Sequence, residues 1–235
     1  PTPNPYRCPI RHCRDRCDFT CLDTGMALAD AQSTGAPAAV IVEPILSVGG
    51  IVPLPPGYLA RLREQCDQRG MLLILDEAQT ALGRVGAMYA FEEHDVVPDI
   101  LTLSKTLGGG LPLAATVTAR AVEEDAAAKG FLHFTSHVSD PLPAAVGRAV
   151  LRTVLADDLP ARAAALGARL RAGLVELQQR HEAIGDVRGQ GLLLGVDLVS
   201  DRDTRTPAPD YSTAVTTRAL ELGVNINIVK FPGFG

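Results

Sequence analysis

The chain contains the run MLLILDEAQT at residues 71–80 and the run DILTLSKTLGGG at residues 99–110. Each run includes a short apolar segment, rich in Leu and Ile, that ends abruptly at a polar residue. Such segments are typical of buried parallel strands, which deliver a side chain to the carboxyl edge of an open α/β sheet. Ligands of open α/β sheets bind along that edge. We therefore expect the carboxylate of Asp76 and the amine of Lys105 to lie at a binding site.

Strand and helix patterns alternate on both sides of these runs. Strand patterns occur at residues 38–42, 71–75, 100–103 and 114–118, and helical spacing occurs at residues 26–32, 58–69 and 88–94. This alternation predicts an α/β fold with a mostly parallel sheet and crossover helices. We assign residues 1–155 to part of a large domain of this kind, with a surface loop before about Thr24.

The composition changes in the C-terminal third of the chain. Two consecutive helices are expected at residues 143–155 and 159–181, because Ala, Leu and Arg recur there at helical intervals. Strands at 191–198 and 225–229, a polar loop at 200–210 and a helix at 211–222 are expected to follow. We therefore assign residues 156–235 to a long linking helix and an incomplete smaller α+β domain.

The overall composition favours a globular protein that acts on small molecules. The chain has 235 residues, is 46% hydrophobic and carries a formal net charge of -5, without blocks of Lys or Arg. This balance argues against nucleic acid or an anionic membrane as the main partner. Glu43, Asp76 and Lys105 interrupt the most apolar stretches, so no membrane span is expected. With no recognisable signal peptide, we expect a cytoplasmic protein, and the first and last residues suggest a fragment lacking both ends.

Four of the five cysteines cluster near the start, at Cys8, Cys13, Cys17 and Cys21, while Cys66 stands alone. A zinc site is one interpretation, but the cluster lacks the two-residue spacings typical of zinc knuckles, and five is an odd number for a disulfide framework. Reduced thiols in a cytosolic protein are the alternative that we favour.

The pairing of Asp76 with Lys105 suggests pyridoxal phosphate as cofactor. A carboxylate at the sheet edge can keep a pyridine nitrogen protonated, and a partly desolvated lysine beside it can bond covalently to an aldehyde. The glycines at 108–110 let the backbone approach a ligand closely. Two alternatives stay open: Lys105 extends its amine into solvent from the strand end, or Asp76 and Glu77 form a Walker B segment of an ATP-binding module. The chain contains no P-loop motif, although one could precede it.

Several ordered motifs carry a family resemblance over nearly the whole chain. They are Glu43-Pro44, LDEAQT at 75–80, GRVG at 83–86, PDI at 98–100, Ser104-Lys105 and VRGQGL at 187–192. Together they resemble the class III, fold-type I pyridoxal-phosphate aminotransferases. The runs at 102–108 and 136–147 resemble most closely the 2,2-dialkylglycine decarboxylases of this family, because Asp140-Pro141-Leu142 stands where ordinary members usually have Asn-Pro-Leu.

The resemblance implies roles for individual residues. Lys105 would be the catalytic lysine that bonds to the cofactor, Asp76 the partner of the pyridine nitrogen, and Gln79 a donor to the cofactor's phenolic oxygen, with Ala78 also in the cofactor site. Lys105, once released, would carry protons to and from the substrate Cα. Arg188 would serve in structural pairing within the small domain.

The resemblance also implies a second copy of the chain and a metal ion. Ser136 would reach the cofactor phosphate of a neighbouring subunit and, with Val138 and Asp140, bind an alkali cation, K⁺ or Na⁺, which prefers oxygen ligands. The same residues could instead form a turn, with Asp140 capping a helix that begins at Pro141. His137 is an alternative acid or base, but Lys105 already fills that role.

The implied activity is decarboxylation-dependent transamination of 2,2-dialkylglycines, with a pyruvate-like 2-oxo acid as amino acceptor, in a homodimer or tetramer whose site lies at a subunit interface. An ordinary ω-aminotransferase without decarboxylation is the alternative, and a truncated product with a purely structural role is another. The family's upstream phosphate loop, its ring-stacking aromatic residue and its downstream carboxylate-binding arginine are absent from this chain. We therefore expect the chain alone to be inactive.

Overall fold

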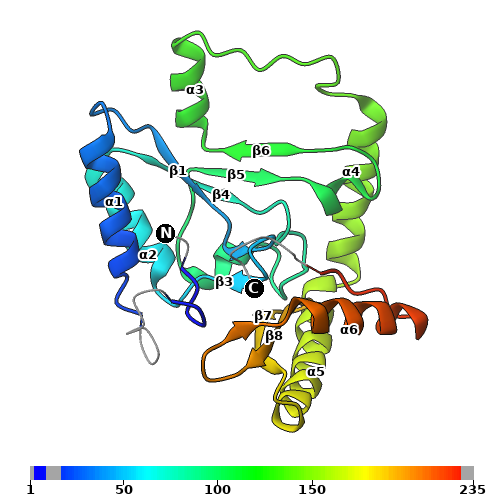
Figure 1. Ribbon diagram of the computed structural model, residues 1–235. Coiled ribbons are helices and arrows are strands. Elements are labelled where there is room, and N and C mark those ends of the chain that lie inside the picture. The colour runs from blue at the N-terminus through cyan, green and yellow to red at the C-terminus, as the bar shows by residue number, and fades with distance from the viewer. Residues whose placement is uncertain (1–2, 9–16, 229–235) are drawn as a thin grey trace.

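The computed structural model describes residues 3–8 and 17–228, and its main feature is a mixed sheet with helices around it (Figure 1). In the described part of the chain the strand order of this sheet is β1-β4-β5-β6. The strands are β1 (Ala39–Val42), β4 (Leu72–Asp76), β5 (Ile100–Leu103) and β6 (Ala115–Thr118). The first three run parallel and β6 runs antiparallel to β5. The predicted α/β class and all four predicted strands are confirmed.

The helices α1 (Thr20–Gln32) and α2 (Tyr58–Arg69) pack together beside β1 and β4 (Figure 1). Leu59, Leu62 and Cys66 recur at helical spacing on one face of α2, and all three are buried. They meet Leu73 and Leu75, which alternate on one face of β4. Burial of each such leucine contributes about 1.5–3 kcal/mol. This core fixes the position at which β4 ends.

Helix α1 begins earlier than predicted, and the expected surface loop before Thr24 is wrong from Thr20 onward. Cys21 and Leu22 belong to the buried core, so the first turn of α1 is part of the packing. The N-cap position is held by Phe19, whose φ of 62° is left-handed and whose side chain forms no capping hydrogen bond. The helix start therefore carries only one of the usual sequence signals, the acidic residue Asp23 in its first turn.

Shorter elements connect these layers. The strands β2 (Ile45–Leu46) and β3 (Val52–Pro53) form a small antiparallel pair, and η1 (Ala90–His94) and η2 (Lys105–Gly108) are 3₁₀ turns. The helix predicted at 88–94 is thus a short 3₁₀ helix. Helix α3 (Arg120–Ala128) was not predicted, and it contributes no buried residue.

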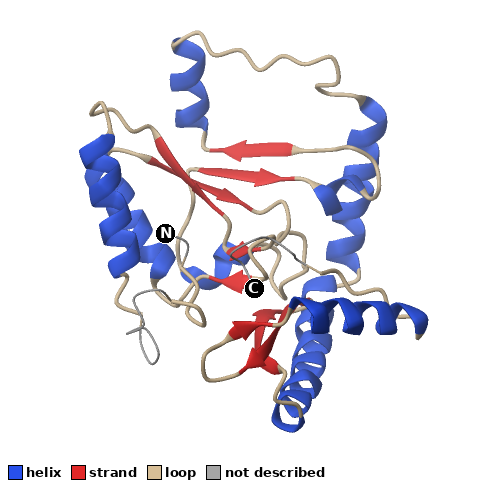
Figure 2. Cartoon of the chain, in the orientation of Figure 1, coloured by secondary structure: helices blue, strands red, loops and turns tan. Residues whose placement is uncertain are grey.

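The C-terminal third forms a second unit, which follows α4 (Pro141–Ala156) and begins with the long helix α5 (Leu159–Arg180). Figure 2 shows its short strands beside α5 and α6. They are β7 (Ile184–Gln190), β8 (Leu193–Asp201) and β9 (Thr206–Pro207), followed by α6 (Pro209–Glu221). Within the described residues no helix is long and apolar enough to cross a membrane.

The strand predicted at 191–198 is confirmed as β8, which begins two residues later than predicted, because Gly189 and Gly191 adopt positive φ values of 111° and 53° and turn the chain between β7 and β8. Two other expectations for this unit are wrong. The polar loop predicted at 200–210 contains the end of β8 and all of β9. Residues 225–228 form no strand, and Val229, the last residue of that predicted strand, lies outside the described residues.

An ion-pair cluster fastens this unit to the start of the chain. The buried carboxylate of Asp197 accepts hydrogen bonds from Arg7 Nη2 at 2.7 Å, Arg7 Nε at 3.2 Å and Arg188 Nη1 at 3.2 Å. Arg188 also pairs with Asp186 and donates from Nε to the carbonyl of Gly50 at 2.9 Å. Arg188 therefore has the structural pairing that we expected, and its contact with Gly50 extends into the large unit.

Candidate functional site

Asp76 is the last residue of β4, and in the parallel pairing its register partner is Thr102 of β5. Asp76 Oδ1 accepts two hydrogen bonds of 3.0 Å, from Thr102 Oγ1 and from the amide of Ala78. No donor among the described residues contacts Oδ2. The carboxylate is thus held by one oxygen while the other stays available to a ligand.

Lys105 follows the end of β5 by two residues and opens the 3₁₀ turn η2. Its φ of 48° lies in the left-handed region, where a residue with a Cβ costs about 1–2 kcal/mol. The side chain is exposed, and within the described residues no carboxylate pairs with its amine. Strain of this kind is concentrated at functional sites. Because β4 and β5 are neighbours, the structure brings Asp76 and Lys105 to the same edge of the sheet.

Helix α4 supports the turn that carries Lys105. Figure 1 shows α4 beside the C-terminal end of β5, and η2 packs against this helix. An added Cβ on Gly109 would lie 2.9 Å from Cγ2 of Val150 on α4, so the backbone of this turn packs directly against the Val150 side chain. Leu107 is buried in the main core. The position of the Lys105 backbone is therefore set by packing on both sides.

Ala78 and Gln79 lie on the loop that follows β4, and both are half-buried. The amide of Ala78 already serves Asp76. Gln79 comes next along the chain and is thus within one residue of that contact. The structure places both predicted cofactor residues beside Asp76, although their predicted contacts with a cofactor stay predictions.

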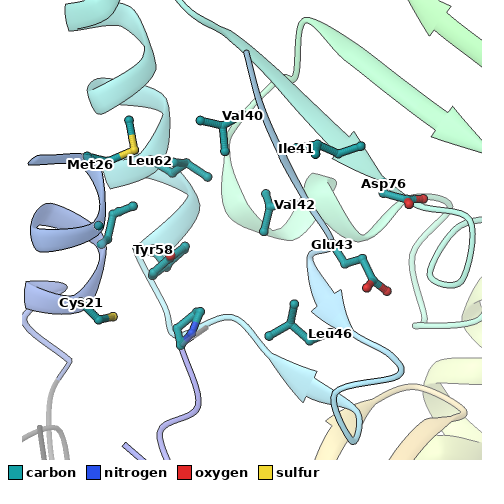
Figure 3. Close-up of a pocket in the computed structure, with 13 residues that line it drawn as sticks. Cys21, Met26, Val40, Ile41, Val42, Glu43, Leu46, Tyr58, Leu62 and Asp76 are labelled. Atoms are coloured by element: carbon teal, nitrogen blue, oxygen red, sulfur yellow. The ribbon is translucent and has the colours of Figure 1, made fainter. Parts of the chain in front are cut away.

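A cavity of about 530 Å³ lies between β1 and the helices α1 and α2, and it reaches Glu43 and Asp76 at the end of the sheet (Figure 3). Val40 and Val42 point toward α1 and α2, whereas Ile41 lies on the same side of the strand as Asp76. Neither Lys105 nor Gln79 lines this cavity. The cavity therefore overlaps the candidate site only at its margin, and the pair of strand ends defines the site better than the cavity does.

Glu43 also stands at the sheet edge, with one carboxylate oxygen held by a local turn. Glu43 Oε2 accepts hydrogen bonds from the hydroxyl of Ser47 at 2.5 Å and from the amide of Ser47 at 3.2 Å. These bonds close the turn after β1. A carboxylate at a strand end is thus not by itself sufficient to identify a ligand-binding residue.

The segment that contains Ser136, Val138 and Asp140 lies between α3 and α4. Ser136 and Val138 are exposed, and Asp140 is half-buried. His137 Nδ1 contacts Asp140 Oδ2 at 2.8 Å, and Asp140 precedes α4 without a side-chain capping bond. The structure therefore leaves most of this segment exposed and shows no contact between it and Asp76 among the described residues. Its roles in phosphate and alkali-ion binding stay predictions.

Two of the sequence motifs meet although they are about a hundred residues apart. The amide of Leu192 donates to the carbonyl of Arg84 at 2.9 Å. Gly191 lies so close to the backbone of Val85 that an added Cβ would overlap it. This contact joins the loop after Asp76 to the β7–β8 turn. Sequence reasoning missed the contact, and it also missed Thr102 as a partner of Asp76.

The cysteines give no support to a zinc site. Cys17, Cys21 and Cys66 are free thiols, and Cys13 lies outside the described residues. Among the residues that the structure describes, no group of three His, Cys, Asp or Glu side chains is placed to hold a metal ion. Burial raises the pKa of the Cys21 thiol above its ordinary value, as it does for Cys66. The two buried thiols behave as core residues.

Similar proteins agree with this arrangement. The chain is 48% identical over its whole length to an uncharacterized aminotransferase of Schizosaccharomyces pombe, of which it covers 53%. It is 37% identical over 98% of its length to a leucine/methionine racemase of Thermococcus litoralis, of which it covers 52%. The chain thus spans about half the length of these curated relatives.

Solved structures give the same result. An amine transaminase from an uncultivated Pseudomonas species, in its PLP-bound form, has a TM-score of 0.87 and 36% identity, covering 97% of this chain and 54% of that one. A Bacillus anthracis aminotransferase has a TM-score of 0.86 at 32% identity and covers 96% of this chain and 52% of that one. The fold is therefore that of the large domain of fold-type I transaminases with part of a second domain. The family model "Aminotransferase class-III" matches residues 4–230, and the chain belongs to this family.

Proposed function

We propose that the longer protein containing this chain is a pyridoxal-phosphate-dependent aminotransferase that moves an amino group from an amine or amino acid to a 2-oxo acid. The observation that carries the proposal is the placement of Asp76 and Lys105 at the ends of adjacent parallel strands. An acid and a strained, unpaired lysine at one sheet edge fit the cofactor's pyridine nitrogen and its aldehyde.

The residues present fit the cofactor in charge and in hydrogen-bonding capacity. Asp76 has one oxygen held by Thr102 and Ala78 and one oxygen available for a protonated ring nitrogen. The side-chain amide of Gln79 is the proposed donor to the phenolic oxygen. When bound, pyridoxal phosphate supplies an electron sink for the bond that breaks at the substrate Cα.

Two of the chain's own residues perform the remaining chemistry. The two donors on Oδ1 keep the Asp76 carboxylate oriented. The amine of Lys105 is the proposed acid and base that moves a proton at the substrate Cα.

A second copy of the chain is the proposed partner at the site, in a homodimer or tetramer. The segment leading to Ser136 exposes Phe131, Leu132 and Phe134 by 67%, 82% and 80%. Apolar side chains gathered in this way mark interaction surfaces. In this arrangement Ser136 reaches the cofactor phosphate of the neighbouring subunit, and Val138 and Asp140 join it in holding K⁺ or Na⁺.

The comparisons support ordinary transamination better than decarboxylation. Relatives at 36–41% identity include a 4-aminobutyrate aminotransferase of Escherichia coli and 5-aminovalerate aminotransferases of two Pseudomonas species. The closeness to 2,2-dialkylglycine decarboxylases has no such support and rests on the sequence runs at 102–108 and 136–147, above all on Asp140-Pro141-Leu142. Decarboxylation-dependent transamination is therefore the second candidate. The ATP-binding alternative loses its basis, because the chain belongs to another family and Glu77 is buried.

The full-length protein, mixed with pyridoxal phosphate, provides the test. We expect a visible absorption band at about 410–420 nm that borohydride abolishes. After this reduction the cofactor should be attached permanently to Lys105, which it then labels. A protein that shows no band, or a label on another lysine, contradicts the proposal. Assays with 4-aminobutyrate, 5-aminovalerate and 2-aminoisobutyrate, each with a 2-oxo acid, then separate the candidates. Carbon dioxide released from 2-aminoisobutyrate in the presence of pyruvate identifies the decarboxylating enzyme.

A further inference from the structure

Glu77, the residue after Asp76, is a fully buried carboxylate, with 0% of its surface exposed. Its Oε2 accepts hydrogen bonds from the amide of Ala90 at 2.7 Å and from Thr80 Oγ1 at 2.9 Å. Its Oε1 accepts a hydrogen bond of 2.9 Å from the amide of Phe91. Within the described part of the chain no cation contacts it. The carboxylate thus meets three donors and no acceptor.

This arrangement ties together two points that are distant along the loop. The amide of Glu77 donates to the carbonyl of Thr102, so its backbone continues the pairing of β4 with β5. Its side chain binds the first turn of η1, thirteen and fourteen residues later. The loop between these points contains Gln79 and the segment that contacts the β7–β8 turn. Glu77 therefore closes this loop at its base.

Burying a carboxylate costs desolvation free energy, so the packing of the core alone does not explain Glu77. Burial raises the pKa of Glu77 above its ordinary value, while the hydrogen bonds from Ala90, Phe91 and Thr80 act in the opposite direction. An apolar residue of similar volume would fill the space without this desolvation cost. What the carboxylate adds is direction, because three donors converge on two oxygens in a fixed geometry.

The contacts of Glu77 with Thr80 and of Ala78 with Asp76 show which part of the loop Glu77 holds in place. Ala78, whose amide holds Asp76 Oδ1, and Gln79 both lie between Glu77 and Thr80, which its carboxylate binds. A shift of the loop base would move these two residues together relative to β4. We infer that Glu77 is a positioning residue, which acts through Ala78 and Gln79 to orient the Asp76 carboxylate and the Gln79 amide toward the cofactor. The inference rests on the proposed function.

The substitution Glu77→Gln tests this in the full-length protein. The glutamine keeps the volume, but its NH₂ group faces a backbone N–H and the negative charge is lost. We expect the dissociation constant for pyridoxal phosphate to rise about ten- to hundredfold. We also expect the pH midpoint of the visible band to move and kcat to fall while the substrate KM stays within about twofold, since only interactions with the cofactor change.

Three further variants control for stability and for loss of charge. Glu93→Gln makes the same chemical change on η1 at an exposed side chain, and we expect wild-type values. Thr80→Val removes one of the three donors, and we expect a few-fold change in the same two cofactor measurements. Thr80→Ser keeps the hydroxyl and should restore them.

The outcomes are distinct. If Glu77→Gln lowers only the thermal midpoint, and its folded form binds the cofactor with wild-type affinity and an unchanged pH midpoint, the inference is wrong while the proposed function stands. If Glu77→Gln does not fold, wild-type cofactor binding and band in Thr80→Val would overturn the inference. If the unmodified protein forms no band at all, the proposed function fails and the inference fails with it.

Discussion

Gly167 of α5 and Gly191 of the β7–β8 turn pack backbone against backbone, so closely that an added Cβ on Gly167 would overlap the carbonyl of Gly191. Gly191 in turn lies against the backbone of Val85. Three segments therefore meet at one point with no side chain between them. Because one of these is the loop after Asp76, the junction links the second unit to the candidate site.

The first prediction concerns this junction. Gly167→Ala should destabilise the protein by about 1–3 kcal/mol or more, because the new methyl group has no space and α5 must move away from the turn. Gly173 lies on the same helix with nothing within 4 Å of an added Cβ. Gly173→Ala should therefore stabilise by up to about 1 kcal/mol through helix propensity. Urea unfolding of both variants measures the difference, and equal values would contradict the packing argument.

The second prediction concerns Lys105. Lys105→Ala should prevent covalent attachment of the cofactor and lower kcat by roughly 10²–10⁴-fold, because the proton carrier at the substrate Cα is lost. Borohydride treatment followed by mass analysis of the labelled peptide measures attachment. Lys129→Ala is a suitable control, since this exposed lysine pairs only with Asp125 on α3. Retention of the label in Lys105→Ala would exclude the assigned role.

The third prediction concerns the charge of Asp76. Asp76→Asn keeps an oxygen for Thr102 and Ala78 but cannot stabilise a protonated ring nitrogen, and kcat should fall roughly 10²–10³-fold. The matched control is Asp95→Asn, because Asp95 is exposed and its φ of 52° is one that asparagine also tolerates. Steady-state kinetics of the two variants checks this. A fully active Asp76→Asn enzyme would remove the acid from the mechanism.

The fourth prediction concerns pH and Asp99, which precedes β5. Burial acts to raise the pKa of Asp99, but hydrogen bonds from Arg63 and the amide of Leu73 lower it below its ordinary value. A lowered folded pKa means that the stabilisation is present above the unfolded pKa and is lost as pH falls through the folded value. Asp99→Asn should cost about 1–3 kcal/mol at pH 7, and the difference from wild type should shrink below about pH 4.

Asp67 provides the control for that experiment. It also pairs with Arg63, at 2.7 Å, but 65% of its side chain is exposed. Asp67→Asn should therefore cost no more than about 1 kcal/mol. Denaturant unfolding of both variants at values between about pH 3 and pH 7 compares the two, because this interval includes the ordinary pKa values of carboxyl groups. A constant Asp99→Asn penalty across this range would show that the carboxylate charge is not the source of the stability.

The strands that carry Asp76 and Lys105 were predictable because local signals agree there. Apolar runs that end at Asp76 and Ser104 mark both strand ends, and Gly70 ends α2 in the left-handed conformation that glycine favours. Helix α3 lacks such signals, since Ala119 forms no capping bond and none of its residues is buried. The start of α1 likewise has no side-chain cap, although Cys21 and Leu22 in its first turn are buried.

The supports of the site could not be predicted, because they depend on contacts between distant segments. The donors to Glu77 come from Ala90 and Phe91, and no spacing in the sequence identifies a backbone amide as the partner of a buried acid. Thr102 was recognised only as part of a strand, because its bond to Asp76 requires the register of β4 and β5. Local patterns thus locate the reactive side chains, whereas the tertiary fold determines their orientation.

The ion pair between Arg7 and Asp197 has a consequence for the connectivity of the molecule. The second unit is attached to the first both through the α4–α5 connection and through this bidentate ion pair near the beginning of the chain. A protease that nicks the exposed Asp157-Asp158 bond would therefore leave two pieces that stay associated. Two separately expressed pieces, divided at this bond, should accordingly reassociate, and the ion pair of Arg7 with Asp197 should stabilise their complex.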